Sequence, residues 1–219
     1  MKLAILAAVI GIGLSQSAHA EQCQQPVLAD AANYKVAIAK RKTNFFGDQG
    51  NPTSAYILRG DEVVVVSQTD KMACVEFSNA NSGGLGWLKL ADLGPIQKQT
   101  LKPADWAGNF QRDNLGSFVE LKAQPGGVLS AKGGAYWAAS AELAKKWGPN
   151  IGELEGDGKI ENGVVHIGTP EKDGTDCTVD LRLLSKHYII VAKHTADDGS
   201  LSCWGHNVSF DGLYVRVKK

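Results

Sequence analysis

GELEGDGKI-ENG-VVHI, residues 152–167, predicts two β-strands joined by a tight turn. Asn162 and Gly163 both tolerate positive φ, which a two-residue hairpin turn requires. Similar strand patterns occur on both sides of this hairpin, and the turns between them are rich in Gly, Asn and Asp. The second half of the chain is therefore predicted to be an antiparallel β-meander. Its other strands are expected at 117–123, 128–137, 178–184, 188–194 and 212–217.

The two ends of this meander are expected to pair with each other. The region opens with W-x-G-x-F (residues 106–110) and closes with G-x-Y-x-R (residues 212–216). Pairing the first strand with the last removes exposed sheet edges, which are prone to aggregation. One short helical insert is predicted from Ser140 to residue 147, because Ser140 can cap its start and Gly148 its end. Residues 106–219 are thus predicted to form an antiparallel meander β-barrel with one short helix.

The first half is also predicted to be all-β. Short strands rich in Val and Ile in about sixty residues are typical of a small β-barrel. A polar loop is expected from residue 43 to residue 54, with Phe45 and Phe46 inside it. A linker over residues 95–105, which contains Pro95 and Pro103, separates the two halves. The strands are expected at 34–38, 56–58, 63–66, 72–77 and 85–88.

Each half resembles a known type of domain. Residues 21–94 resemble the bacterial SH3-like domain through GDEVVV (60–65), CVEF (74–77) and GWL (86–88). This resemblance implies a small barrel in which the loop after the first strand flanks a ligand groove. Residues 106–219 resemble a C-terminal domain of small periplasmic proteins, some of them lysozyme-inhibitor-like. That resemblance is carried by the W-x-G-x-F opening, AYW (135–137) and CWGHNVSFDGLYVR (203–216).

Residues 1–20 have the pattern of a signal peptide. Lys2 is followed by an apolar run over residues 3–14 and by AHA at 18–20, which is a small-x-small cleavage site. The competing interpretation is an uncleaved N-terminal anchor. No later segment is apolar enough to span a membrane. The sequence therefore predicts a protein that is exported to the periplasm or secreted.

The cysteines and the charge balance limit the possible partners. Four cysteines in an oxidising compartment predict two disulfides, and their clustering favours Cys23 with Cys74 and Cys177 with Cys203 over the two other pairings. A metal site is the weaker alternative, because no C-x-x-C spacing occurs. The 23 basic and 23 acidic residues balance, so nothing favours nucleic acid as a partner.

No convincing catalytic set is found in the sequence. His187 and His194 lie at the ends of one predicted strand, and His206 lies near Cys203, which a disulfide would remove as a nucleophile. Adjacent acids such as those at 197–198 are typical of solvated turns. We therefore expect no enzyme activity, no bound metal and no cofactor.

Binding is the remaining function, and two loops are candidate sites. Phe45 and Phe46 are adjacent aromatic residues, so one ring could be exposed for stacking on a sugar or peptide. Trp204, His206 and Asn207 form the other candidate, beside Cys203. The expected function is that of a cell-envelope binding protein for cell-wall peptide, a peptidoglycan fragment or a protein partner. The alternative is an inhibitor or immunity protein directed at a lysozyme-like or other peptidoglycan hydrolase.

Overall fold

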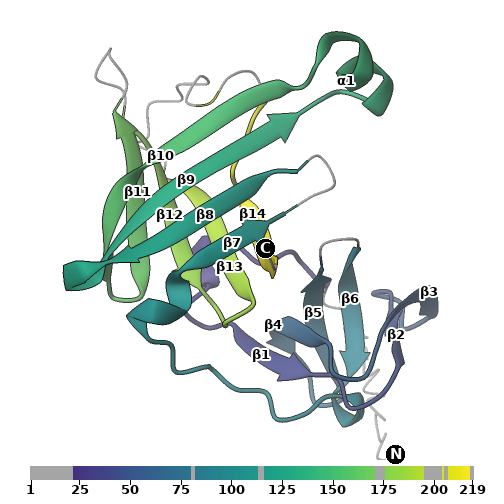
Figure 1. Ribbon diagram of the computed structural model, residues 1–219. Coiled ribbons are helices and arrows are strands. Elements are labelled where there is room, and N and C mark those ends of the chain that lie inside the picture. The colour runs from purple at the N-terminus through teal and green to yellow at the C-terminus, as the bar shows by residue number, and fades with distance from the viewer. Residues whose placement is uncertain are drawn as a thin grey trace, which may run out of the picture.

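The chain folds into two antiparallel β units (Figure 1). The computed structural model describes residues 22–79, 82–112, 116–170, 176–194, 204 and 207–217. The predicted signal peptide lies outside these residues. The first unit contains β1 (Lys35–Ile38), β2 (Thr43–Phe46), β3 (Pro52–Ile57), β4 (Glu62–Gln68), β5 (Met72–Ser78) and β6 (Gly83–Lys89). The second contains β7 (Gly108–Gln111), β8 (Phe118–Gln124), β9 (Val128–Trp137), β10 (Asn150–Glu161), β11 (Val164–Pro170), β12 (Asp176–Leu183), β13 (Tyr188–His194) and β14 (Gly212–Val217).

The second unit is a closed antiparallel barrel, as predicted. Each strand from β7 to β14 pairs with the next one along the chain, and β14 pairs with β7 to close the barrel. In the closing pair, Arg216 lies opposite Phe110. The turn between β10 and β11 has positive φ at Asn162 (52°) and Gly163 (76°), as the hairpin pattern requires. The all-β fold class with a meander barrel is therefore confirmed.

Alternating side chains fill the barrel interior. The aromatic side chains of Trp106, Phe110, Phe210 and Tyr214 are buried in one core with aliphatic residues from all sides of the barrel. The guanidinium of Arg216 closes one end of this core. It lies over the Phe110 ring, at 4.5 Å from the centroid, and donates to the carbonyl oxygens of Asp105, Ala107 and Lys186.

The predicted helical insert is helix α1 (Ala141–Trp147). The Ser140 hydroxyl accepts a hydrogen bond from the backbone N–H of Leu143, and Gly148 ends the helix with φ 77°. The helix joins β9 to β10 and projects from one end of the barrel (Figure 1). Trp147 is 76% exposed there.

The first unit differs from its prediction in two ways. It is a six-stranded sheet of order β1-β4-β5-β6-β2-β3, where a small barrel was predicted. The expected loop over residues 43–54 is largely the hairpin of β2 and β3. These residues form a strand because buried and exposed side chains alternate along β2: Thr43 and Phe45 are buried, and Asn44 between them is exposed. The Gly- and Pro-containing turn beside the aromatic pair dominates the local pattern and conceals this alternation.

Short 3-10 turns and the predicted linker complete the chain. The start of the linker region lies along β1, through bridges between Ala39 and Leu93 and between Val36 and Gln97. Within the described residues, no helix is long and apolar enough to cross a membrane. The 3-10 turns are η1 (Leu28–Asp30), η2 (Leu90–Asp92), η3 (Pro103–Trp106) and η4 (Pro125–Gly127).

The two β units share an apolar cluster. Val36 and Val64 from the first sheet pack with Tyr188, Ile190 and other residues of β13 and β14. All these side chains are buried. The units therefore dock through a core of their own, and not only through the linker that joins them.

Candidate functional site

Strand β5 has two faces with different roles, because successive side chains of a strand point in opposite directions. One face packs into the core of the first sheet through Ala73, Val75 and Phe77. The other face carries Cys74, Glu76 and Ser78. Cys74 is bonded to Cys23 and Ser78 contacts the barrel at Tyr188. Glu76 lies between these two fixed points.

Tyr188 links the barrel to the first sheet. Its hydroxyl lies 2.8 Å from the carbonyl oxygen of Glu62 and 2.9 Å from that of Ser78, and it is 3.4 Å from the Ser78 N–H that donates to it. A phenol carries one proton, so it donates to one of these carbonyls at a time. Burial raises the pKa of Tyr188, which keeps this donor protonated at neutral pH.

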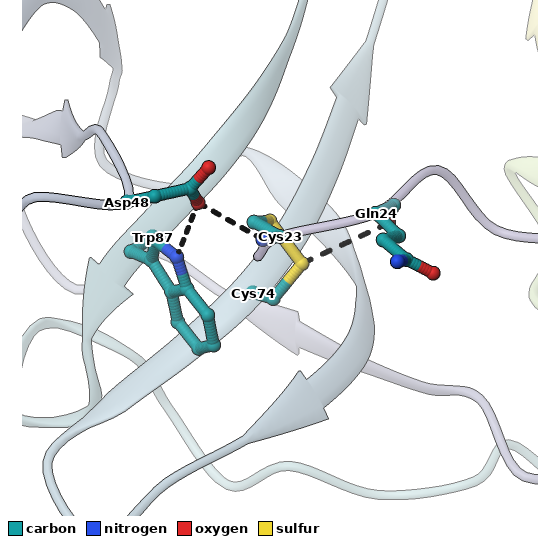
Figure 2. The surroundings of a disulfide bond; sticks show 5 residues. All are labelled: Cys23, Gln24, Asp48, Cys74 and Trp87. Carbon is teal, nitrogen blue, oxygen red and sulfur yellow. Dashed lines mark hydrogen bonds between the residues drawn. A yellow bond between two sulfur atoms is a disulfide. The ribbon is translucent and has the colours of Figure 1, made fainter. Parts of the chain in front are cut away.

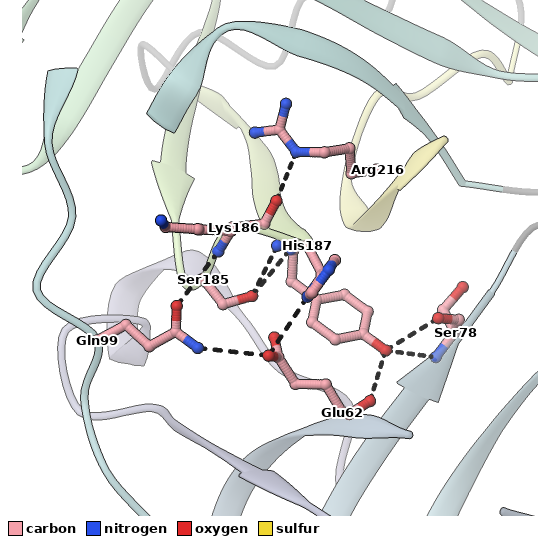
Figure 3. Close-up of polar contacts among 8 residues, drawn as sticks. Glu62, Ser78, Gln99, Ser185, Lys186, His187 and Arg216 are labelled. Carbon is pink, nitrogen blue, oxygen red and sulfur yellow. Dashed lines mark hydrogen bonds and ion pairs between the residues drawn. The ribbon is translucent and has the colours of Figure 1, made fainter. Parts of the chain in front are cut away.

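His187 pairs with Glu62 at the same junction (Figure 3). Its Nδ1 lies 3.4 Å from Glu62 Oε2, to which Gln99 Nε2 also donates at 3.3 Å. The neighbouring Ser185 hydroxyl is fully buried and accepts from the backbone N–H groups of His187 and Tyr188. That hydroxyl therefore stabilises the turn before β13. This His–Glu pair therefore joins the barrel to the first sheet.

A cavity of about 410 Å³ lies at this junction, and we call it the junction cavity. Its walls come from the N-terminal segment at residues 25–26, from β5 and β6 around Glu76, and from the barrel at Arg112 and residues 211–213. Because both units contribute walls, the cavity depends on their docking. Small-molecule sites are commonly found at such boundaries.

Glu76 is the distinctive group of the junction cavity. Burial raises the pKa of its carboxyl to about 7. Among the described residues, no hydrogen bond or ion pair engages this side chain. A carboxylate that is desolvated without compensation favours its neutral form. Glu76 is therefore poised to change charge near neutral pH and to gain from an incoming cation.

The guanidinium of Arg112 does not neutralise Glu76, although both line the cavity. Arg112 Nη1 donates to the carbonyl oxygens of Ser209 (2.9 Å) and Asp211 (2.6 Å). Its guanidinium also lies 5.6 Å from the centroid of the Tyr214 ring. Arg112 thus holds the segment before β14 in place. Since Asp211 also lines the cavity, acidic groups outnumber basic ones there.

We predict that Glu76 makes the protein less stable as the pH rises from about 4.5 to about 7. The folded state binds the proton more tightly than the unfolded state, in which the carboxyl has its ordinary pKa of 4.5. Stability therefore falls across this window as the unfolded state releases its proton first. Glu76→Gln should raise the free energy of unfolding at pH 8 by up to about 3 kcal/mol and change little at pH 4.

Urea unfolding at both pH values measures this effect. Glu153→Gln, at an exposed position of β10, removes the same charge and should leave the pH dependence as it is in the unaltered protein. If Glu76→Gln shifted stability equally at pH 4 and pH 8, the carboxyl would not be desolvated in the folded state.

The Cys23–Cys74 disulfide anchors the segment that forms one wall of the cavity (Figure 2). The predicted pairing of these two cysteines is confirmed. Asp48 reinforces the anchor, because its Oδ1 accepts from the backbone N–H of Cys23 at 2.9 Å and from Trp87 Nε1 at 3.0 Å. Cys177 is also disulfide-bonded. Its predicted partner, Cys203, lies outside the described residues.

The predicted aromatic sites are largely buried. Phe45 is 3% exposed in the core of the first sheet, so it offers no ring for stacking. Trp204 is 6% exposed in the barrel core and packs edge-on against Phe210, with centroids 5.3 Å apart. Neither the Phe45 ring nor the Trp204 ring is therefore open to stacking by a ligand. Of the adjacent aromatic pair, Phe46 is the partly exposed member.

The other predicted site residues do not gather in one place. Phe46 is partly exposed, and Lys89 Nζ lies 5.1 Å from its ring centroid. Asn207 is exposed and has φ 61°, which fits a turn. His206 lies outside the described residues. Phe46 and Asn207 belong to different β units, so a binding role for either one stays a prediction.

The sequence contains a signal for Glu76 that the two predicted loop sites leave out. Glu76 follows Cys74 by two residues, so a strand places both on one face. A cysteine expected in a disulfide marks that face as covered, and a carboxylate beside it is then expected to be partly desolvated. Finding the cavity itself required knowledge of the barrel docking.

Comparison with known protein families, curated proteins and solved structures finds no match to this chain. Inside the described ranges, no group of three or more His, Cys, Asp or Glu side chains is placed to hold a metal ion. The junction cavity is therefore judged by its own geometry and charge.

Proposed function

We propose that the chain is an exported, non-catalytic binding protein of the cell envelope, and that its junction cavity takes the positively charged amine of a cell-wall peptide. The signal-peptide pattern of residues 1–20 supports export. The Cys23–Cys74 disulfide is compatible with an oxidising compartment.

One observation carries the proposal: Glu76 is desolvated in the cavity without a cationic partner. An ammonium group within hydrogen-bond distance would stabilise the ionised carboxylate and lower its pKa. Asp211 adds a second acidic group to the cavity wall. Peptides with a free side-chain amine supply the matching charge, and cell-wall peptides include such groups.

The proposal predicts that a soluble cell-wall peptide with a free amine binds the protein at pH 8, and that Glu76→Gln weakens this binding at least tenfold. Losing one charge-assisted hydrogen bond of about 1.5–3 kcal/mol accounts for that factor. Isothermal titration calorimetry on the full mature chain measures the affinity. The same peptide with its amine acetylated should not bind detectably.

Glu153→Gln is the matched control, since it removes an exposed carboxylate from the outer surface of β10. It should bind as the unaltered protein does. Equal affinity for the free and the acetylated peptide, or no binding of either, would contradict the proposal.

The alternative of a hydrolase inhibitor receives less support. It rests on the inhibitor-like resemblance of residues 106–219 and on the loop beside Cys203, in which the Trp204 side chain is buried in the barrel core. Cys203 and His206 of the same loop lie outside the described residues.

A further inference from the structure

A second cavity, of about 460 Å³, lies at the end of the barrel near the turn between β10 and β11. We call it the barrel-end cavity. Three parts of the chain line it: residues 31–34 after η1, residues 98–106 of the linker region and η3, and the barrel ends around Ile160, Arg182 and Leu183. It shares no lining residue with the junction cavity, so it requires an explanation of its own.

The floor of the barrel-end cavity is apolar. Trp106 and Leu183 line it, and both belong to the barrel core, at 4% and 5% exposure. Leu101 and Ile160 also line it and are partly buried against the same core. The cavity therefore continues the apolar interior to the surface. An apolar body that displaces water from such a surface binds favourably, because apolar area is removed from water.

The charged groups of the barrel-end cavity are both cations. Lys98 and Arg182 line it, and no carboxylate is among its described lining residues. Arg182 Nη2 donates to the backbone carbonyl oxygen of Asn162 at 3.3 Å. In the described part of the chain, neither Lys98 nor Arg182 forms an ion pair. Their charge is therefore available to a ligand.

Two further polar side chains line the cavity, and both are already engaged. The Tyr34 hydroxyl accepts from the backbone N–H of Val27 at 2.8 Å. Gln99 Nε2 donates to Glu62, and Gln99 Oε1 accepts from the backbone N–H of Lys186 at 3.4 Å. The Gln99 amide thus ties the linker to both β units. Glu62 itself does not line the cavity.

We propose that the barrel-end cavity binds a small amphiphilic anion, with its apolar body on the Trp106 floor and its anionic group between Lys98 and Arg182. A carboxylate can accept from both cations, and guanidinium–carboxylate bonds are among the stronger polar contacts. The inference is independent of the amine proposed for the junction cavity.

The test uses decanoate as the probe, followed by backbone amide NMR on the full mature chain. Decanoate should cause saturable shifts at Ala32 and Gly163, which flank the cavity. Decylammonium has the same chain and the opposite charge, so it should bind at least tenfold more weakly. Acetate lacks the apolar body and should cause no saturable shift.

The double variant Lys98→Gln, Arg182→Gln should bind decanoate at least tenfold more weakly than the unaltered protein. The matched control is Lys145→Gln, Lys146→Gln, which removes two exposed cations from α1 and should not change the affinity. Equal binding of decanoate and decylammonium, undiminished binding in the first variant, or an absence of shifts at Ala32 and Gly163 would each overturn the inference.

Discussion

Replacing Gly108 by alanine is expected to lower the free energy of unfolding by about 3 kcal/mol or more. A Cβ at this position would overlap Nη1 of Arg216, and the residue has φ 157°. Arg216 cannot turn aside cheaply, because its guanidinium donates to three backbone carbonyl oxygens and covers Phe110. Alanine would displace it and weaken the contact that closes the barrel.

Urea unfolding of Gly108→Ala, with Gly47→Ala as the matched control, measures this cost. A Cβ added at Gly47 would meet no atom within 4 Å, so this substitution should change stability by less than about 1 kcal/mol. Adding Gly108→Ala to Arg216→Ala should then cost clearly less than in the unaltered protein, since the clash has been removed and only the backbone strain at φ 157° remains. A full additive cost in that background would show that Arg216 is not the cause.

Removing the Cys23–Cys74 disulfide is expected to cost about 4 kcal/mol. The two cysteines are 51 residues apart, so the bond restricts a long loop of the unfolded chain. The double variant Cys23→Ser, Cys74→Ser tests this bond alone, whereas a reducing agent would also act on Cys177. Urea unfolding gives the size of the loss.

The same double variant should also weaken binding in the junction cavity. The bond holds the segment that supplies Gln25 and Pro26 to its wall. Decanoate binding at the barrel-end cavity, which that segment does not line, should persist and so serves as the internal control. A stability loss below about 1 kcal/mol would contradict the assigned role of the bond.

Much of the barrel could be predicted from the sequence because its signals are local. Asn162 and Gly163 specify a hairpin, and the bounds of β9, β13 and β14 match the predicted strands. Closure was also predictable, since the motif ending at Phe110 and the motif ending at Arg216 suit neighbouring strands. The hairpin and the strand bounds depend on residues close together in the chain, and closure follows from two local motifs at the ends of the meander.

The burial of Phe45 and Trp204 was predicted less well because their decisive contacts are distant in the chain. Phe45 lies beside a turn rich in Gly and polar residues, yet its ring packs against the strands of a six-stranded sheet. Trp204 has polar neighbours in sequence, yet it enters the barrel core beside Phe210. Such burial results from tertiary packing, so the polarity of neighbouring residues in the sequence does not predict it.

The candidate site needed the docked structure as well. Alternation along β5 places Glu76 and Cys74 on one face, which the sequence could have indicated. The junction cavity also requires residues of the barrel, such as Arg112 and Asp211. Its charge becomes evident only when these groups are seen together with their hydrogen bonds.

The pH dependence of amine-peptide affinity is the most direct test of Glu76 as the recognition group. With a carboxyl pKa of about 7, the ionised fraction rises about tenfold between pH 6 and pH 8, and affinity should rise by the same factor. In Glu76→Gln the residual affinity should be the same at both pH values. Calorimetric titration at pH 6 and pH 8 gives the ratio. An affinity of the unaltered protein that does not change between these values would contradict the account.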